Sequence, residues 1–243
     1  MNKGILVSII TVSFNSEKTI RNTIESVLNQ TYNNIEYIII DGNSTDKTLE
    51  IVKEYEEKFK NKSYIYRIIS EKDDGIYDAM NKGIRLSNGE LIGIINSDDN
   101  YEVNAVVNIV NEYNIDNNYY VYHGLLRYYN DGQLFMIRGS NSDVLKKHMI
   151  EHPACFVAKK AYEEIGLFDC NFRYVADYDF LCRLKIKNKN FKLIDKIIAN
   201  FHDGGAGDCK ESRVEALRVL KKYNYIGNSR YLLKRLFMKL NII

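Results

Sequence analysis

Two adjacent carboxylates, Asp98 and Asp99, directly follow a short apolar stretch of the chain. This stretch runs from Leu91 to Ile95 and is typical of a strand that is buried on both faces of a sheet. Carboxylates at the end of such a strand are costly unless a positive charge meets them. Ligands bind outside the carboxyl ends of parallel strands, so a divalent metal that carries a phosphorylated ligand would satisfy both conditions. The alternative is a polar turn in which one of the two carboxylates caps a helix that begins near Val103.

Hydrophobic periodicity predicts that strands and helices alternate in the first half of the chain. Apolar runs typical of buried strands occupy residues 5–12, 35–40 and 64–70, and helical spacing of apolar residues follows each run. These strands and the one at Leu91 end in acid or amide side chains: Asn15, Asp41, Asp73 and Asp98. Because parallel strands end at one edge of a sheet, we expect these side chains to converge there.

The second half of the chain has a less regular pattern. The stretch 130–132 (Asn-Asp-Gly) lies between two apolar runs and indicates a hairpin. Helices are predicted over 159–165 and 177–187, and a strand over 191–201. The sequence therefore predicts an α/β fold with a mostly parallel central sheet, Rossmann-like and flanked by helices.

Composition indicates one large globular domain with an appendage. The chain has 243 residues, of which 45% are hydrophobic and 27% are charged. The net charge of +2 gives no argument for a nucleic-acid partner, and we expect none. The charge is unevenly distributed, because the segment from Lys210 onward carries nine basic and two acidic residues. We therefore expect a domain over 1–209 and a basic helical tail over 210–243.

The cysteines and the N-terminus predict a cytoplasmic protein. No Cys-x-x-Cys pair is present, so neither a zinc site nor a dense disulfide framework is indicated. The first residues lack the apolar region of a signal peptide, and no apolar run is long enough to span a bilayer.

The tail itself resembles a helix that lies on a membrane. Basic residues separate apolar ones that recur at helical spacing, namely Leu232, Leu233, Leu236, Phe237 and Leu240. A basic amphipathic helix can bind an anionic lipid surface, which would place the protein at the inner face of the membrane. The alternatives are a helix packed on the domain or on a second subunit, so a homo-oligomer also stays open.

Five polar motifs along the chain together resemble those of a known family. They are Ser13-Phe14-Asn15, Asp41-Gly42-Asn43-Ser44-Thr45-Asp46, Asp73-Asp74-Gly75-Ile76-Tyr77-Asp78-Ala79-Met80-Asn81-Lys82-Gly83, Asn96-Ser97-Asp98-Asp99 and Ala176-Asp177-Tyr178-Asp179. In this order they resemble a family 2 inverting glycosyltransferase with the GT-A fold, of the type that builds bacterial surface polysaccharides. The resemblance covers about residues 5–205. It implies a nucleotide-sugar donor, most often a uridine diphosphate sugar, a saccharide or lipid-linked saccharide acceptor, and an Mg²⁺ or Mn²⁺ ion.

The resemblance also implies roles for single residues on the donor side. The end of the first strand would hold the base and ribose together with Asp41, and Asp73 would face the nucleoside. The alternative for both aspartates is a helix cap. The full set of implied substrate contacts is Thr11, Ser13, Asn15, Asp41, Asp73, Asn81, Asn96, Ser97, His152 and Asp179.

Two implied metal ligands are Asp98 and His202, which follows the last predicted strand. The alternative for His202 is an ordinary polar residue. His152 would line the acceptor side, or else be an ordinary loop residue. The chain departs from the family pattern where Asn96 replaces an acidic residue of the metal motif and where Ala176 replaces the glutamate before the base.

The remaining role is that of a general base. An inverting transfer needs an acceptor hydroxyl that attacks opposite the leaving diphosphate, and a base that takes its proton. The family pattern assigns this base to Asp177, and Asp179 would then cap the helix or hold a neighbouring backbone group or an arginine.

Two other functions compete with glycosyl transfer. A sugar-phosphate nucleotidyltransferase would carry an N-terminal glycine-rich loop with basic residues, whereas the first strand here runs into Ser13-Phe14-Asn15. A non-catalytic module that binds nucleotide sugars is the other, and retention of Asp98 and Asp177 argues against it.

Overall fold

The computed structural model describes residues 4–202 and 209–239. Its strands are β1 (Val7–Ser13), β2 (Ile35–Asp41), β3 (Ile65–Ser70), β4 (Leu91–Ile94), β5 (Asn100–Tyr101), β6 (Val121–Asn130), β7 (Gln133–Arg138), β8 (Cys155–Ala158) and β9 (Phe191–His202). Its helices are α1 (Ile20–Leu28), α2 (Thr48–Lys53), α3 (Glu56–Asn61), α4 (Ile76–Leu86), α5 (Ala105–Ile115), α6 (Lys159–Ile165), α7 (Ala176–Ile186), α8 (Lys210–Lys222) and α9 (Asn228–Lys239). Two short 3₁₀ helices are η1 (Ser142–Lys146) and η2 (His152–Ala154).

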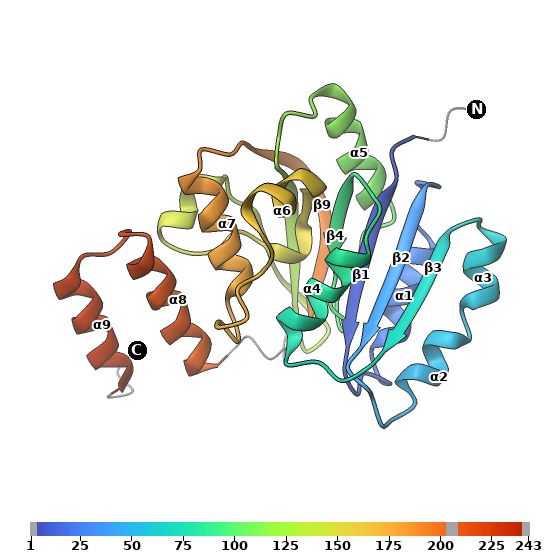
Figure 1. The fold of residues 1–243 in the computed structure, drawn as a ribbon, viewed down its shortest axis with the longest axis horizontal. Coiled ribbons are helices and arrows are strands. Elements are labelled where there is room, and N and C mark those ends of the chain that lie inside the picture. Colours follow the sequence, from blue (N-terminus) through green and yellow to red (C-terminus); the bar gives the residue numbers. More distant parts are fainter. Residues whose placement is uncertain (1–3, 203–208, 240–243) are drawn as a thin grey trace.

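The described strands form one mixed sheet in the order β3-β2-β1-β4-β8-β6-β9-β5, with β7 paired to β6. The first four of these are parallel to one another, and their carboxyl ends lie at one edge of the molecule, the lower edge in Figure 1. Beyond β4 the directions mix, because β8 runs antiparallel to both β4 and β6, whereas β9 is parallel to β6. The predicted parallel arrangement therefore describes the N-terminal half, and the whole sheet is mixed.

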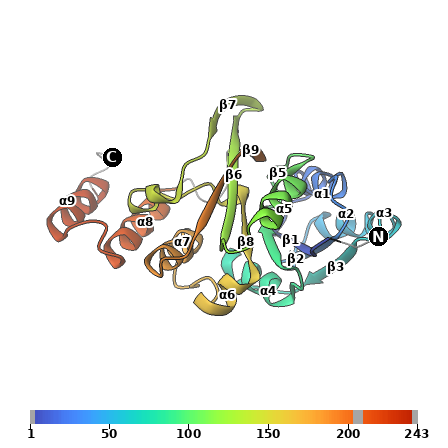
Figure 2. The same ribbon diagram turned by 90° about the horizontal axis from the view of Figure 1, so that it is seen from above.

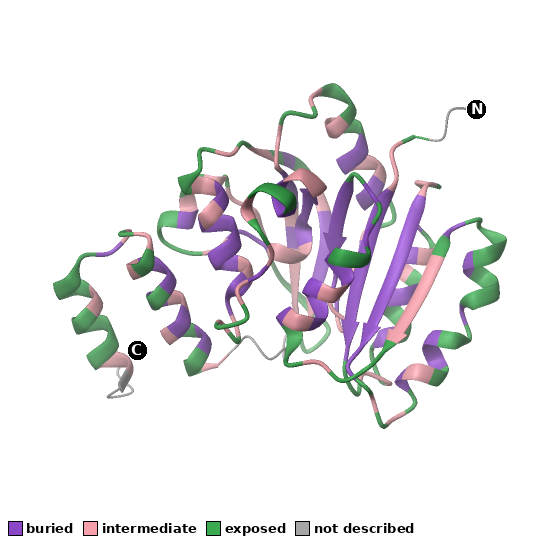
Figure 3. Cartoon of the chain, viewed as in Figure 1, coloured by how far each residue is buried: buried purple, intermediate pink, exposed green. Residues whose placement is uncertain are grey.

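Helices cover both faces of the sheet (Figure 1). Strand β1 alternates its side chains between the faces, so Ile10 and Val12 pack with α4, α6, α7 and α8, whereas Val7 and Ile9 pack with α1, α2, α3 and α5. The central strands are buried along their length (Figure 3), as the unbroken apolar runs predicted. The sheet is thus a rigid base for the side chains at its carboxyl edge.

The hairpin predicted at residues 130–132 is confirmed. Strands β6 and β7 pair antiparallel, and both Asp131 and Gly132 have positive φ angles, as a tight turn of this kind requires. The tip of this hairpin projects from the rest of the molecule in Figure 2.

The division predicted at residues 209 and 210 stays a prediction. Leu217, Val219 and Leu220 of α8 are part of the same core cluster as residues of α4 and α7. Helix α9 is the peripheral element and appears largely exposed in Figure 3. Leu240 of the predicted apolar face lies outside the described residues. Within the described part of the chain, no helix is both long and apolar enough to cross a bilayer.

Candidate active site

The ends of β1, β2 and β3 meet at Asp41. The strand register places Ser13 and Ser70 on either side of it, and both hydroxyls donate to its carboxylate, at 3.2 and 2.7 Å. The backbone N–H and the hydroxyl of Ser44 also donate to Asp41, at 3.0 and 2.5 Å. The predicted convergence of strand ends is therefore correct, and Asp41 organises the turn that follows β2.

Four of the predicted substrate contacts are buried and hydrogen-bonded within the protein. Asp41 and Asp179 have no exposed surface, and their oxygens are occupied by hydrogen bonds within the protein. Thr11 is buried in the middle of the sheet and accepts a hydrogen bond from the Tyr37 hydroxyl. The Asn81 amide bonds the backbone of Phe168 through both its oxygen and its nitrogen. Thr11, Asp41 and Asp179 have no exposed surface, and Asn81 is 3% exposed. The direct contact of these four residues with a substrate stays a prediction.

Asp73 lies close to Gly42 and Phe14. A Cβ atom on Gly42 would come within 2.6 Å of Asp73 Oδ2 and 3.4 Å of the Phe14 ring, so only glycine leaves this space open. The Phe14 side chain is 64% exposed. Asp73 Oδ1 accepts from the N–H of Gly75, whose φ of +116° lies in the region that favours glycine, so one oxygen does cap the turn before α4. The other oxygen lies close to Gly42, beside the exposed Phe14 ring.

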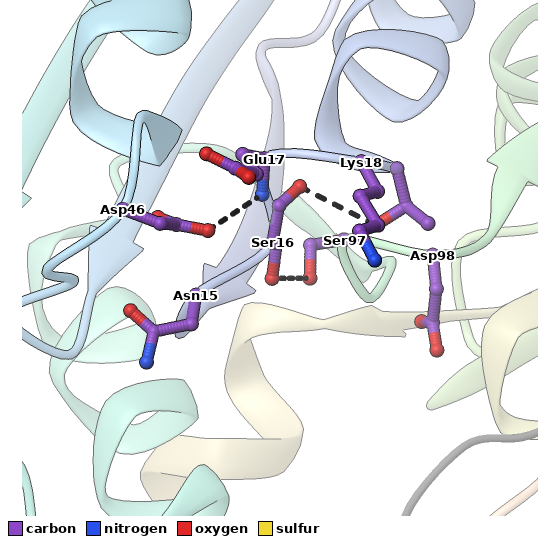
Figure 4. A pocket seen from close by; sticks show the side chains of 8 residues that line it. Asn15, Ser16, Glu17, Lys18, Asp46, Ser97 and Asp98 are labelled. Atoms are coloured by element: carbon purple, nitrogen blue, oxygen red, sulfur yellow. Dashed lines mark hydrogen bonds between the residues drawn. The ribbon is translucent and has the colours of Figure 1, made fainter.

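A pocket of about 350 Å³ lies at the start of α1. It is lined by Asn15, Ser16, Glu17, Lys18, Thr19, Asp46, Ser97 and Asp98. The hydroxyls of Ser16 and Ser97 are 2.8 Å apart and join the segment after β1 to the segment after β4. Figure 4 shows that Asn15 and Asp98 point away from α1 toward the same side. Asn15 adopts a φ of +51°, which asparagine tolerates better than most residues, and this conformation turns the chain sharply after β1.

Asp98 and Asp99 have different surroundings. The backbone N–H of His202 donates to Asp99 Oδ1 at 3.1 Å, so the end of β9 lies against this motif. Burial, and secondly the charge of Asp98, raise the pKa of Asp99 well above its ordinary value. Burial also raises the pKa of Asp98, and the nearby His202 partly offsets this increase. Neither carboxylate caps α5, whose first residues follow Asn104, so the capping alternative is excluded.

A metal ion is compatible with the oxygen atoms at this motif. Asn96 Oδ1 and Asp99 Oδ2 are buried without a hydrogen-bond partner among the described residues. Such oxygens, together with the Asp98 carboxylate, are ligands that Mg²⁺ and Mn²⁺ prefer. The described residues contain no group of three or more His, Cys, Asp or Glu side chains that could hold a metal ion.

His202 is held at the edge of this motif. Its ring stacks on Tyr129 of β6 with a centroid distance of 5.2 Å, and its Nε2 is 3.1 Å from Asn100 Nδ2. The predicted role of His202 as a metal ligand stays a prediction.

Asp177 begins the first turn of α7, at the same edge of the sheet. Its Oδ1 accepts from the Tyr77 hydroxyl and from the N–H of Tyr178, both at 2.8 Å. Its Oδ2 is 3.9 Å from His152 Nδ1, which is too long for a hydrogen bond. Burial lowers the pKa of His152, and the charge of Asp177 opposes this effect only in part. His152 therefore lies beside the predicted base as a neutral imidazole at pH 7.

Comparison with known families identifies the chain. Residues 8–174 match the model described as glycosyl transferase family 2. The chain belongs to this family. The matched region includes the predicted donor-side residues. Asp177 and α8 come after it in the sequence.

Relatives and solved structures agree with this assignment. The chain is 28% identical over 193 residues to the Escherichia coli UDP-Glc:alpha-D-GlcNAc-diphosphoundecaprenol beta-1,3-glucosyltransferase WfaP, covering 77% of this chain and 72% of that one. S. aureus TarS 1–349 in complex with UDP-GlcNAc superposes with a TM-score of 0.73 at 16% identity, covering 92% of this chain and 68% of that one. A longer TarS chain also matches, and the match covers 40% of its length. The mannosyltransferase PcManGT from Pyrobaculum calidifontis, in complex with GDP-Man and Mn²⁺, gives a TM-score of 0.73 at 15% identity over 93% of this chain and 66% of that one. The protein is therefore an enzyme, a glycosyltransferase, and its fold is GT-A.

Two residues at the site were missed by the sequence analysis. Phe14 occurs in a quoted motif, but no role was given to it, although one large apolar residue between polar ones after a strand is a signal for an exposed contact. Tyr77 was part of the 73–83 motif, and its bond to Asp177 spans 100 residues of sequence, which no local pattern indicates.

Proposed function

We propose that the protein transfers a sugar, with inversion, from a uridine diphosphate sugar to a saccharide or lipid-linked saccharide in the synthesis of a surface polysaccharide. The observation that carries this proposal is the placement of two carboxylates, Asp98 and Asp177, which lie on separate segments at the carboxyl edge of one sheet. An inverting displacement needs a negative group on each side of the sugar, one for the metal and one for the acceptor proton.

The nucleoside would bind beside Phe14, Gly42 and Asp73. The exposed Phe14 ring offers a surface on which a base can stack, and Asp73 Oδ2 would accept a hydrogen bond from the uracil imide N–H. Asn15 and Ser97 line the neighbouring pocket and would contact the ribose and diphosphate.

A divalent ion would be held by Asp98, with Asn96 Oδ1 and His202 beside it. When bound, the ion supplies positive charge that stabilises the leaving diphosphate. Because no third acidic, cysteine or histidine ligand completes the cluster within the described residues, the donor diphosphate would supply the remaining contacts. Mg²⁺ and Mn²⁺ are the ions that fit this oxygen-rich set.

Asp177 would act as the base. Its Oδ2 accepts no hydrogen bond from the described residues and is therefore available to an acceptor hydroxyl. Proton transfer to this oxygen, as the acceptor oxygen bonds to the anomeric carbon and the diphosphate leaves, makes the hydroxyl a competent nucleophile.

The acceptor would be presented at a membrane surface. Leu232, Leu233 and Leu236 of α9 are each at least half exposed, and Arg230, Lys234 and Arg235 lie exposed around them. Tyr231 and Met238 pack on the domain, so the helix is fixed by one face and offers the other. Such a face suits an anionic bilayer. The name of the WfaP relative specifies a lipid-linked acceptor, and this supports the same placement here.

A panel of nucleotide sugars tests the function. We expect release of uridine diphosphate from one UDP-sugar, only with Mg²⁺ or Mn²⁺ present, and a product whose anomeric configuration, read from proton NMR couplings, is opposite to that of the donor. Retained configuration would exclude inversion. Release from no nucleotide sugar, with or without saccharide acceptors, would contradict the proposal.

A further inference from the structure

The hydroxyl of Tyr77 lies against the carboxylate of the proposed base. Tyr77 is in the first turn of α4, and its hydroxyl is 2.8 Å from Asp177 Oδ1 and 2.9 Å from the carbonyl oxygen of Tyr174. The side chain is only 6% exposed, and its ring packs on Phe168 at a centroid distance of 5.5 Å. This hydroxyl therefore serves the carboxylate and the backbone before it, and is not part of the surface that a substrate would contact.

We propose that Tyr77 is a positioning residue that fixes the orientation of the Asp177 carboxylate and leaves one defined oxygen free for the acceptor. This inference rests on the proposed function, in which Asp177 is the base.

The orientation of the carboxylate follows from its hydrogen bonds. Both donors, the Tyr77 hydroxyl and the N–H of Tyr178, bond to Oδ1. No described residue donates to Oδ2, since His152 Nδ1 is 3.9 Å away. The carboxylate therefore cannot rotate without losing two bonds, and Oδ2 is the oxygen that stays open to a hydroxyl. A base fixed in this way loses little entropy when the acceptor arrives.

The Tyr77 hydroxyl acts as a hydrogen-bond donor to the Asp177 carboxylate. Burial, and secondly the charge of Asp177, raise the pKa of the Tyr77 hydroxyl well above 10, so it keeps its proton at pH 7. A donor to a carboxylate stabilises the charged form, so removal of the donor makes protonation of the carboxylate easier and moves it to higher pH.

Among residues 4–202 and 209–239, the other titratable groups near Asp177 and Tyr77 include His152 from η2, Cys155 from β8 and Glu215 from α8. Burial lowers the pKa of His152 and raises the pKa of Cys155 well above 9, so both are neutral at pH 7. Neither neutral group adds a charge that could replace the effect of the Tyr77 donor.

Glu215 contributes by holding the backbone before α7. Its two carboxylate oxygens accept from the N–H groups of Arg173 and Tyr174, at 3.1 and 2.8 Å. The carbonyl of the same Tyr174 accepts from Tyr77. Helix α8 therefore fixes the segment against which the Tyr77 hydroxyl is aligned, and this geometry does not depend on a bound substrate.

The test compares Tyr77→Phe with a matched control, Tyr162→Phe, in the full chain. Tyr162 is also 6% exposed and packs on the same Phe168 ring at 6.1 Å, but its hydroxyl bonds none of the described residues. The titration of the Asp177 carboxyl carbon is followed by carbon NMR, with the signal assigned by its loss in Asp177→Asn. We expect the midpoint in Tyr77→Phe to lie about one pH unit above that of the wild type, and Tyr162→Phe to match the wild type.

Steady-state kinetics adds a second readout. Tyr77→Phe should lower kcat about tenfold at pH 7, because the carboxylate loses a bond that orients it, and should move the acid limb of the pH–rate profile upward, with an unchanged KM for the donor. An unmoved midpoint in Tyr77→Phe, or an equal shift in Tyr162→Phe, would overturn the role of Tyr77. Failure of the proposed function is distinguishable, because it would appear as wild-type turnover by Asp177→Asn, whatever Tyr77→Phe does.

Discussion

Asp179 and Asp177 lie in the same turn of α7. We predict that substitution of Asp179 lowers stability but leaves sugar transfer intact, whereas substitution of Asp177 abolishes transfer but leaves stability nearly unchanged. Asp179 is fully buried, and its oxygens accept from Lys222 Nζ and Tyr223 Oη at 2.7 Å and from Arg183 Nε at 3.0 Å. In Asp179→Ala, Lys222 regains water because its side chain is already 42% exposed. Arg183 and Tyr223 each lose a bond to a charged acceptor, worth about 1.5 kcal/mol apiece, so unfolding should become easier by about 3 kcal/mol.

Thermal unfolding followed by circular dichroism measures this difference. A loss of about 3 kcal/mol should lower the melting temperature by about 6–12 °C in a chain of this size. Asp177→Asn should stay within about 1 kcal/mol of the wild type, because its side chain is partly exposed and an amide oxygen can still accept from Tyr77. At temperatures where Asp179→Ala is folded, it should still transfer sugar. The reasoning is refuted if Asp179→Ala melts with the wild type, or if Asp177→Asn is destabilised as strongly.

The remaining predictions concern the metal, the nucleoside, acid stability and the tail. Chelation or Asp98→Ala should abolish transfer in a folded protein, and full activity in excess chelator would exclude the metal. Phe14→Ala should weaken uridine diphosphate binding about tenfold by calorimetry, whereas Phe135→Ala, equally exposed on the hairpin, should not. Burial lowers the pKa of His123 to about 4, so below about pH 6.5 the unfolded chain binds a proton that the folded chain does not. Urea unfolding should therefore show up to about 3 kcal/mol lost between pH 6.5 and 4, and His123→Phe should remove that loss. Full-length protein should sediment with anionic liposomes and a chain ending at Tyr225 should not, and equal sedimentation would defeat the membrane role of α9.

Local patterns predicted the elements of the first half because β1, β2 and β4 are buried along their length and α1 and α4 each bury one face. Strand β3 is only partly buried. The hairpin was predictable from the stretch 130–132, because two of its three residues adopt the positive φ angles that a tight turn needs. The mixed order of the second half was not predictable, because β5 and β8 are too short for a periodic signal and their pairings join distant segments. The boundary expected at 209 and 210 followed charge, whereas the packing of α8 follows a few apolar positions.

The location of the candidate site was predictable from the sequence, but the roles of its individual residues were not. The acid and amide residues do converge, since parallel strands end together. Which of them a ligand can reach is decided by tertiary contacts: Asp41 is enclosed by serines from two neighbouring strands, and Asp179 by Lys222 and Tyr223 of α8 and the segment after it. Asp177 has the same local sequence setting as Asp179 but faces the edge of the sheet.

The central claim is that Asp177 serves proton transfer and not donor binding. The decisive measurement is made on one preparation of Asp177→Asn, with affinity for the UDP-sugar donor determined by calorimetry and transfer to the acceptor by product formation. The account predicts a donor affinity equal to that of the wild type and a transfer rate lower by a factor of about one hundred or more. Transfer near the wild-type rate, or a loss of transfer explained entirely by lost donor affinity, would contradict it.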